Sequence, residues 1–297
     1  MIEILIWIAI MILTVALVTF VLSRLPKSVF FLAIILCISG VSFPLFQSQF
    51  SHTDGAFAYL KFLSTGLACL IVGWYRFAGS QPNWPRIALY IIFIVNILEA
   101  VAFEILDVVS GGPERSMGGN LLNAVAGVIL ILTLTGPGSI QRNAGRVEYD
   151  LGRIWIAAYI LWNFVFVLGT NPPERPTGEY AGFAVIHLSV AAILMGSGGR
   201  LFAEMRTYSL FLLMGMILVL PAPPFLYRTA NWHSFILADG LAIASLALAA
   251  ILLIVHLTGF RSKSKQSSST EGNMKVSNSQ NSLIQWIYHR VVAHGHR

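Results

Sequence analysis

Charged residues are scarce in this sequence of 297 residues: they make up 11% of the chain, whereas hydrophobic residues make up 56%. A soluble globular domain has about 25% charged residues and about 45–50% apolar ones. The composition therefore excludes an ordinary soluble domain and a disordered chain, and it predicts an integral membrane protein. The sequence has only two cysteines, Cys37 and Cys69, both within apolar runs, which excludes a disulfide-rich secreted scaffold.

Sequence motifs of several enzyme classes are also missing. There is no serine nucleophile elbow, no H-E-x-x-H zinc motif and no glycine-rich dinucleotide fingerprint. His289, His294 and His296 near the C-terminus lack a further fixed ligand and make a poor metal site. We therefore expect no metal and no cofactor. These absences weaken an enzymatic interpretation without removing it, so whether the chain is an enzyme stays open.

Long apolar runs dominate what is present. A helix that crosses a bilayer needs about 20 mostly apolar residues. The runs here are continuous rather than alternating, which favours helices, since their backbone groups are satisfied internally. The sequence predicts an all-α, multi-pass transmembrane helix bundle of about nine spans within residues 1–260. The expected spans are 2–23, 28–46, 55–75, 87–109, 119–135, 152–169, 181–197, 201–220 and 234–259.

The distribution of basic residues predicts the orientation of this bundle, because lysine and arginine accumulate on the cytoplasmic side. The odd-numbered connections and the segment after the last span carry twelve basic residues, whereas the even-numbered connections carry three, Arg115, Arg175 and Arg228. The N-terminus is therefore expected outside and the C-terminus in the cytoplasm. The net charge of +6 then serves contact with anionic lipid. We expect the lipid bilayer as a partner and no nucleic acid.

The segment after the last span divides into two parts. Residues 261–281 are rich in Ser, Asn and Gln and are typical of a flexible cytoplasmic linker. Residues 282–297 combine apolar residues such as Trp286 and Ile287 with basic ones such as Arg290. They fit an amphipathic helix on the inner membrane face and a disordered tail equally well.

Polar residues inside the spans are the main indication of function, because ionisable groups are costly in a membrane and usually face its protein interior. On the predicted orientation nearly all of them fall in the outer half of the bilayer. Four on one span share an arc of about 140° on the helix surface. The candidate pocket residues are Asn96, Glu99, Glu104 and Asp107, together with Lys61, Asn120, Asn123, Asn163, His187 and Asp239.

Each of these residues also has a structural interpretation. Glu104 and Asp107 would be ordinary at the water interface, and Lys61 could extend its ammonium to the headgroups. The asparagines could join helices by hydrogen bonds, and His187 could be a packing residue. Glu99 is the hardest to explain in this way because it is expected deepest. Carboxyls this close in an apolar environment cannot all ionise, so at least one is expected to be protonated.

Small residues at a spacing of four give a separate prediction about packing. Gly119, Asn123 and Gly127 recur on one face of the fifth expected span. Small side chains at this spacing let a neighbouring helix approach closely. We therefore expect close packing of the fourth and fifth spans.

Three strings, in this order, resemble a family of bacterial multi-pass membrane proteins without an assigned function. They are NILEA at 96–100, GNLLNAVAG at 119–127 and AYILWNF at 158–164. The resemblance covers roughly residues 50–255. It implies recurring residues at Glu99, Asn120, Asn123, Trp162 and Asn163, but it implies no activity.

Three functions fit these observations. The first is a proton-coupled transporter of a small solute or ion, or a binding protein for such a ligand. Its acidic pocket would lie in the outer half of the bacterial cytoplasmic membrane, and Glu99 would carry the proton or cation. The second is an intramembrane enzyme on a lipidic or terpenoid substrate, with Glu99 or Asp107 as general acid and Trp162 and Phe164 lining the cavity. The third is an accessory membrane subunit without a site of its own.

Overall fold

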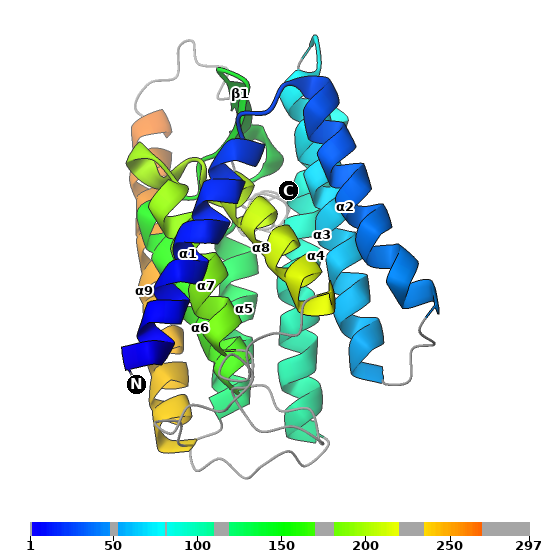
Figure 1. Ribbon diagram of the computed structural model, residues 1–297. Helices are drawn as coiled ribbons and strands as arrows, with labels where there is room; N and C mark the ends of the chain where they lie inside the picture. The colour runs from blue at the N-terminus through cyan, green and yellow to red at the C-terminus, as the bar shows by residue number, and fades with distance from the viewer. Residues whose placement is uncertain are drawn as a thin grey trace. The chain divides into compact units, whose positions relative to one another are not determined.

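The computed structural model describes residues 2–47, 53–80, 82–109, 119–169, 181–219 and 235–268, which are almost entirely helical (Figure 1). The elements in chain order are α1 (Ile2–Leu22), α2 (Lys27–Gln47), α3 (Thr53–Phe77), α4 (Asn83–Val109), α5 (Gly119–Thr133), β1 (Ile140–Asn143), β2 (Arg146–Tyr149), α6 (Arg153–Gly169), α7 (Ala181–Leu194), α8 (Phe202–Val219) and α9 (Phe235–Ser268). Short 3₁₀ turns at Pro137–Ser139 and Ser197–Gly199 precede β1 and α8.

The predicted helices are confirmed, with end points that differ by a few residues. The largest difference is in α9, which continues to Ser268 and so passes residue 260, where the membrane domain was expected to end. The remaining linker residues, 269–281, and the predicted interfacial segment, 282–297, lie outside the described residues. Among the described helices three are long and apolar enough to cross a membrane, at Leu5–Leu22, Asn83–Val109 and Ile236–Thr258.

A short β-hairpin between α5 and α6 was not predicted. Strands β1 and β2 pair antiparallel, with Ile140 opposite Tyr149 and Asn143 opposite Arg146. The two loop residues, Ala144 and Gly145, have φ values of 46° and 71°. Positive φ at both central positions defines the type I′ turn, whose twist suits a two-residue hairpin.

The described chain forms two compact units. Unit 1 comprises residues 1–92, 140–149 and 179–228, so it contains α1, α2, α3, the β-hairpin, α7 and α8. Unit 2 comprises residues 93–139, 150–178 and 229–297, so it contains most of α4, together with α5, α6 and α9. Each unit has its own core.

The core of unit 1 is formed by helices that lie far apart in the sequence. Val15 of α1, Ile186 and Val190 of α7 and Leu213 of α8 belong to one buried cluster. Phe62 of α3 stacks on Phe211 of α8 with ring centroids 5.0 Å apart. These contacts join α1, α3, α7 and α8.

The core of unit 2 is built around an aromatic row on α6. The rings of Trp155 and Tyr159 stack 5.3 Å apart, and Tyr159 and Trp162 follow at 5.7 Å. Small residues of the neighbouring helices, such as Ala126 of α5 and Ala242 of α9, are fully buried. Large rings on one helix are therefore accommodated by small side chains on the others.

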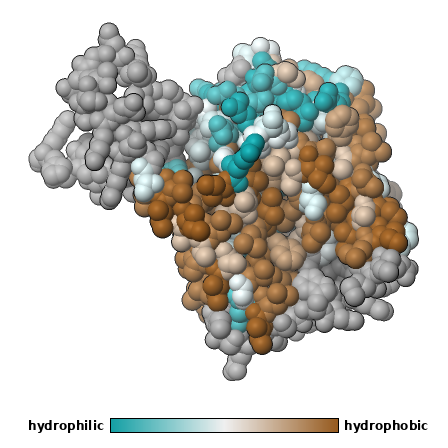
Figure 2. Space-filling view, turned by 90° about the vertical axis from the view of Figure 1, so that its left-hand side faces the viewer, coloured by the Kyte–Doolittle hydropathy of each residue, from teal (hydrophilic) through white to brown (hydrophobic). Residues whose placement is uncertain are grey.

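Large apolar side chains are exposed along many of the helices. Leu13 of α1, Leu36 of α2 and Ile254 of α9 are each about 60–70% exposed. Figure 2 shows one face on which apolar surface extends below a hydrophilic end, the end that carries β1 in Figure 1. An apolar surface of this extent on a folded chain is typical of contact with a membrane.

Candidate functional site

The ten predicted pocket residues divide between the two units. Lys61 and His187 belong to unit 1, and the others belong to unit 2. Within unit 2 the polar residues come from four helices. These residues are Asn96, Glu99, Glu104 and Asp107 of α4, Asn120 and Asn123 of α5, Asn163 of α6 and Asp239 of α9.

The two carboxyls nearest the C-terminal end of α4 each pair with an amide of α5. Asn123 Nδ2 donates to Glu104 Oε1 at 2.5 Å, and Asn120 Nδ2 donates to Asp107 Oδ2. The partner number on α5 falls as the number on α4 rises, so the two helices are antiparallel here. A spacing of three places both carboxyls on one face of α4 and both amides on one face of α5. We call Glu104, Asp107, Asn120 and Asn123 the acid–amide cluster.

Asn123 also connects this cluster to α6. Its Nδ2 donates to the main-chain oxygen of Trp162 at 3.1 Å, and the indole Nε1 of Trp162 donates to the main-chain oxygen of Asn123 at 3.0 Å. This reciprocal pair fixes the orientation of both side chains. The Asn123 side chain therefore bridges a carboxyl on α4 and the backbone of α6.

Close packing at Gly127 makes these contacts possible. A Cβ atom at Gly127 would lie 2.5 Å from Val101 Cγ2 and 2.8 Å from Trp162 Nε1. Both distances are shorter than real Cβ contacts, so only glycine fits between α4 and α6 at this point. The predicted contact between the fourth and fifth spans is found here through the Val101 side chain, whereas the helices whose backbones lie closest to α5 are α9 and α6.

Burial distinguishes the members of the polar set. Glu104, Asn123 and Asp239 are at most 1% exposed, whereas Asn96, Glu99 and Asp107 are half-buried. The most buried carboxyl of α4 is thus Glu104 and not Glu99, the residue that sequence reasoning placed at the centre. In an apolar surrounding such a carboxyl requires hydrogen-bond partners, which the amide of Asn123 supplies.

Two buried amide oxygens of unit 2 need a donor. Asn123 Oδ1 and Asn163 Oδ1 accept no hydrogen bond from any described residue. A buried acceptor without a donor costs about 1–3 kcal/mol. A hydrogen-bond donor, such as a protonated carboxyl or an ammonium group, would remove this cost, as would a metal cation coordinated by the oxygen.

The two predicted site residues of unit 1 lie in a basic region of that unit. His187 of α7 is 4% exposed, and Ser209 of α8 donates its hydroxyl to the His187 main-chain oxygen at 3.2 Å. Lys61 of α3 is half-buried, and His187 is within electrostatic reach of both Lys61 and Arg206. The structure thus places Lys61 and His187 in the same unit.

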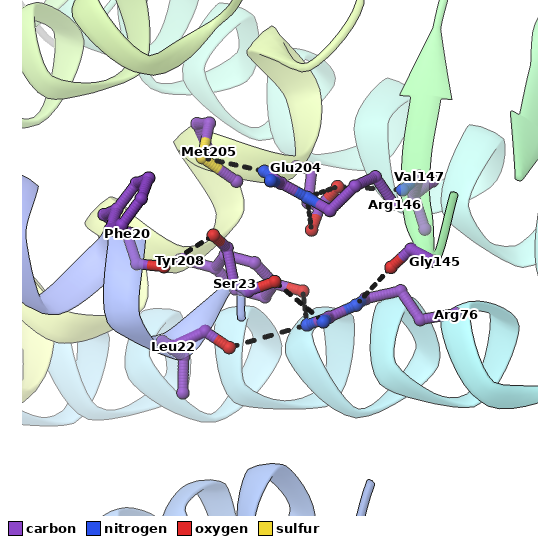
Figure 3. A network of polar contacts seen from close by, with 10 residues as sticks. All are labelled: Phe20, Leu22, Ser23, Arg76, Gly145, Arg146, Val147, Glu204, Met205 and Tyr208. Atoms are coloured by element: carbon purple, nitrogen blue, oxygen red, sulfur yellow. Dashed lines mark hydrogen bonds and ion pairs between the residues drawn. The ribbon is translucent and has the colours of Figure 1, made fainter. Parts of the chain in front are cut away.

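Sequence reasoning missed a buried arginine at one end of unit 1. Arg76, at the C-terminal end of α3, is 6% exposed. It donates to the main-chain oxygens of Ser23 at 2.7 Å and Gly145 at 2.9 Å, and to the Tyr208 hydroxyl at 3.3 Å (Figure 3). A cation at the C-terminal end of α1 also complements the helix dipole. Arg76 therefore ties α1, the β-hairpin and α8 to α3.

An ion pair with a buried carboxylate holds the same β-hairpin against α8. Arg146 Nε lies 3.2 Å from Glu204 Oε1, and the main-chain N–H of Val147 donates to Glu204 Oε2 at 2.8 Å (Figure 3). The Glu204 side chain has no exposed surface. From the sequence, Arg76 and Arg146 were recognised only as two of the twelve basic residues of the expected cytoplasmic segments. A clearer signal was available in Glu204, an acidic residue two positions before Arg206 in a helix that is otherwise strongly apolar.

Among the described residues, no group of three or more histidine, cysteine or acidic side chains is placed to hold a metal ion. The acid–amide cluster of unit 2 consists of carboxyls and carboxamides, which bind protons, cations and hydrogen-bond donors.

Comparison with known proteins identifies a family. A model of a family of unknown function (DUF5692) matches residues 1–280, which include both units and the whole acid–amide cluster. No curated protein and no solved structure matches the chain. The predicted resemblance to a family without an assigned function is confirmed, whereas the bacterial origin and the multi-pass arrangement stay predictions.

Proposed function

The chain belongs to the family of unknown function DUF5692, and we propose that it is a multi-pass protein of the bacterial cytoplasmic membrane that binds or transports a small solute or ion. In this proposal all nine helices cross the bilayer, the N-terminus is outside and the C-terminus is cytoplasmic. The extent of exposed apolar surface supports the membrane location. The basic residues at one end of unit 1, such as Arg24, Arg142 and Arg200, support the orientation.

The observation that carries the functional part is the acid–amide cluster. Helix α4 has membrane-spanning length and composition, yet it directs Glu104 and Asp107 at amides of α5 instead of at water. Ionisable residues in such helices usually serve ion or proton pathways. Asn123 Oδ1, buried beside Glu104, adds an acceptor that a bound cation or proton would satisfy. The proposed site thus takes a positively charged ligand.

The proposed site is centred on Glu104, with Asp107, Asn120 and Asn123 around it. Glu99, Asn96, Asn163 and Asp239 complete the acidic interior of unit 2. Lys61 and His187 belong to unit 1 and stay in the proposal as a separate basic region of that unit.

The enzymatic alternative rests on aromatic side chains that would line a cavity. Trp162 is 1% exposed and packs directly against Gly127, so its ring fills space between helices. No observation in the described chain therefore favours general-acid catalysis over ligand binding. The accessory-subunit alternative predicts that substitution of Glu104 has no functional consequence.

A thermal-shift experiment tests the proposal on the purified full-length chain. Wild type, Glu104→Gln and the control Glu148→Gln are melted with Na⁺, K⁺, ammonium or no added cation over a series of pH values. We expect the melting temperature of the wild type and of Glu148→Gln to respond to pH or to one cation, and that of Glu104→Gln to lose this response. Identical responses in all three proteins would contradict a charged ligand at Glu104.

A further inference from the structure

The orientation of the Asn123 carboxamide is fixed by its neighbours. Both hydrogen atoms of Nδ2 are used, one toward Glu104 Oε1 at 2.5 Å and one toward the Trp162 main-chain oxygen at 3.1 Å. A flipped amide would direct its oxygen at two other oxygens. The indole N–H of Trp162 is engaged with the Asn123 main-chain oxygen. Asn123 Oδ1 is therefore fixed as an acceptor whose donor must come from elsewhere.

We propose that this donor is a proton carried by Glu104, so that the glutamic acid and the asparagine amide form a pair with two parallel hydrogen bonds. In this pair Glu104 Oε2–H donates to Asn123 Oδ1, while Asn123 Nδ2–H donates to Glu104 Oε1. A carboxylic acid and a carboxamide each present one donor and one acceptor on the same planar edge, so they are complementary. The inference deepens the proposed function and rests on it: the ligand of the acidic site is a proton, and Glu104 is its carrier.

Burial and charge in unit 2 both favour this form. Glu104 is 1% exposed, and transfer of a carboxylate into such a surrounding is costly unless it is compensated. The titratable side chains carried by the helices of unit 2 are Glu99 and Asp107 of α4, Tyr159 of α6, and Asp239 and His256 of α9, whereas α5 contributes none. Further negative charge in the same unit opposes ionisation of Glu104. The cations of these helices are Arg86 in the first turn of α4, Arg153, the first residue of α6, and Arg261, Lys263 and Lys265 near the end of α9.

The second acid–amide pair places a carboxyl between Glu104 and the end of the helix. Asp107 and Asn120 lie one turn closer to the α4 C-terminus and the α5 N-terminus than Glu104 and Asn123 do. Asp107 is half-buried, so it exchanges protons with water more readily than Glu104. When Glu104 releases its proton, one hydrogen bond breaks and a buried negative charge remains. Release is therefore coupled to whatever then compensates that charge, which is the requirement for coupled transport.

Infrared spectroscopy of the purified full-length protein tests this assignment. A protonated carboxyl has a carbonyl stretch above the amide I band, and a carboxylate does not. Near neutral pH we expect such a band in the wild type, its loss in Glu104→Gln, and its retention in Glu99→Gln and Asp107→Asn. The Asn123→Leu variant should shift the band, because the amide partner is removed. A band that survives Glu104→Gln, or that disappears only in Asp107→Asn, would overturn the proposal.

Thermal stability gives a second readout that does not depend on spectral assignment. Glutamine at position 104 can donate from Nε2 to Asn123 Oδ1 and accept from Asn123 Nδ2, so it reproduces both hydrogen bonds of the acid. We therefore expect Glu104→Gln to melt close to the wild type and Glu104→Leu to melt well below it. If Glu104→Gln loses as much stability as Glu104→Leu, Glu104 is ionised and the proposal fails.

These results separate the inference from the proposed function. A band that depends on Glu104, found together with identical responses of all variants to pH and cations, would leave the proton as a structural feature and contradict the ligand-binding function. Absence of the band with a response to Na⁺ or ammonium that depends on Glu104 would support the function and contradict the proton.

Discussion

Asn123 and Trp162 exchange two hydrogen bonds, each side chain donating to the main-chain oxygen of the other at 3.1 and 3.0 Å. The pair joins α5 to α6 and fixes the amide that receives Glu104. The geometry of the acidic site therefore depends on an aromatic residue that has no charge of its own.

Substitution of Trp162 tests this dependence. Phenylalanine would keep a ring at the site but lose the indole donor and part of the packed volume, so we expect Trp162→Phe to lower stability by about 1–3 kcal/mol. Trp74→Phe is the matched control, since Trp74 is 55% exposed and the change should stay within about 0.5 kcal/mol. Denaturant unfolding in detergent measures both. Equal effects of the two substitutions would show that the reciprocal pair has no special role.

Gly127 provides a test of the close approach of α4, α5 and α6. A Cβ atom there meets Val101 Cγ2 at 2.5 Å, whereas one at Gly240 of α9 meets nothing within 4 Å. Gly127→Ala should cost about 1–3 kcal/mol through overpacking. Gly240→Ala should gain up to about 1 kcal/mol from helix propensity. The opposite signs are measured by thermal unfolding, and a stabilising Gly127→Ala would refute the close packing at this glycine.

The stability lost when an ion pair of the β-hairpin is broken should depend strongly on how buried that pair is. Glu204→Gln removes the charge opposite Arg146 at a side chain with no exposed surface, and should cost on the order of 3 kcal/mol. Glu148→Gln affects a pair with Arg200 at 3.7 Å in which the Arg200 side chain is 59% exposed, and should cost less than about 1 kcal/mol. Melting temperatures of the two variants compare them directly. A Glu148→Gln effect as large as that of Glu204→Gln would argue against a special role of the Arg146–Glu204 pair in holding the β-hairpin.

The proposed orientation makes a prediction about labelling. In a chain with Cys37→Ser and Cys69→Ser, Glu114→Cys and Gln141→Cys lie on opposite sides of the expected membrane. We expect an impermeant maleimide added to intact cells to label Glu114→Cys only, and to label Gln141→Cys after the cells are opened. Labelling of both positions from the same side would contradict the topology.

The helices were predictable because each is a continuous apolar run that ends at glycine, proline or polar residues. The local arc of α4 was also predictable, since it follows from the helical period and places Glu104 and Asp107 together. The partners Asn120 and Asn123 were recognised as polar residues, but their pairing requires the register between α4 and α5, which no local pattern contains.

Three features were beyond sequence reasoning for physical reasons. Arg76 and Glu204 stand near helix ends, where charged residues normally reach water, and only tertiary contacts bury them. The β-hairpin has strands of four residues, too short for a clear alternation, and its turn uses Ala144 instead of the usual asparagine or aspartate. The central role assigned to Glu99 was based on expected depth, whereas burial depends on which face of α4 meets a neighbour.

Proton movement into proteoliposomes tests the central role of Glu104 most directly. The full-length chain is reconstituted into vesicles that contain a pH-sensitive dye. An inside-negative membrane potential, which drives protons inward, is then imposed. We predict internal acidification above that of protein-free vesicles for the wild type and for Glu148→Gln, and none above that level for Glu104→Gln. Acidification by Glu104→Gln at the wild-type rate, or none by the wild type, would contradict a proton-carrying Glu104.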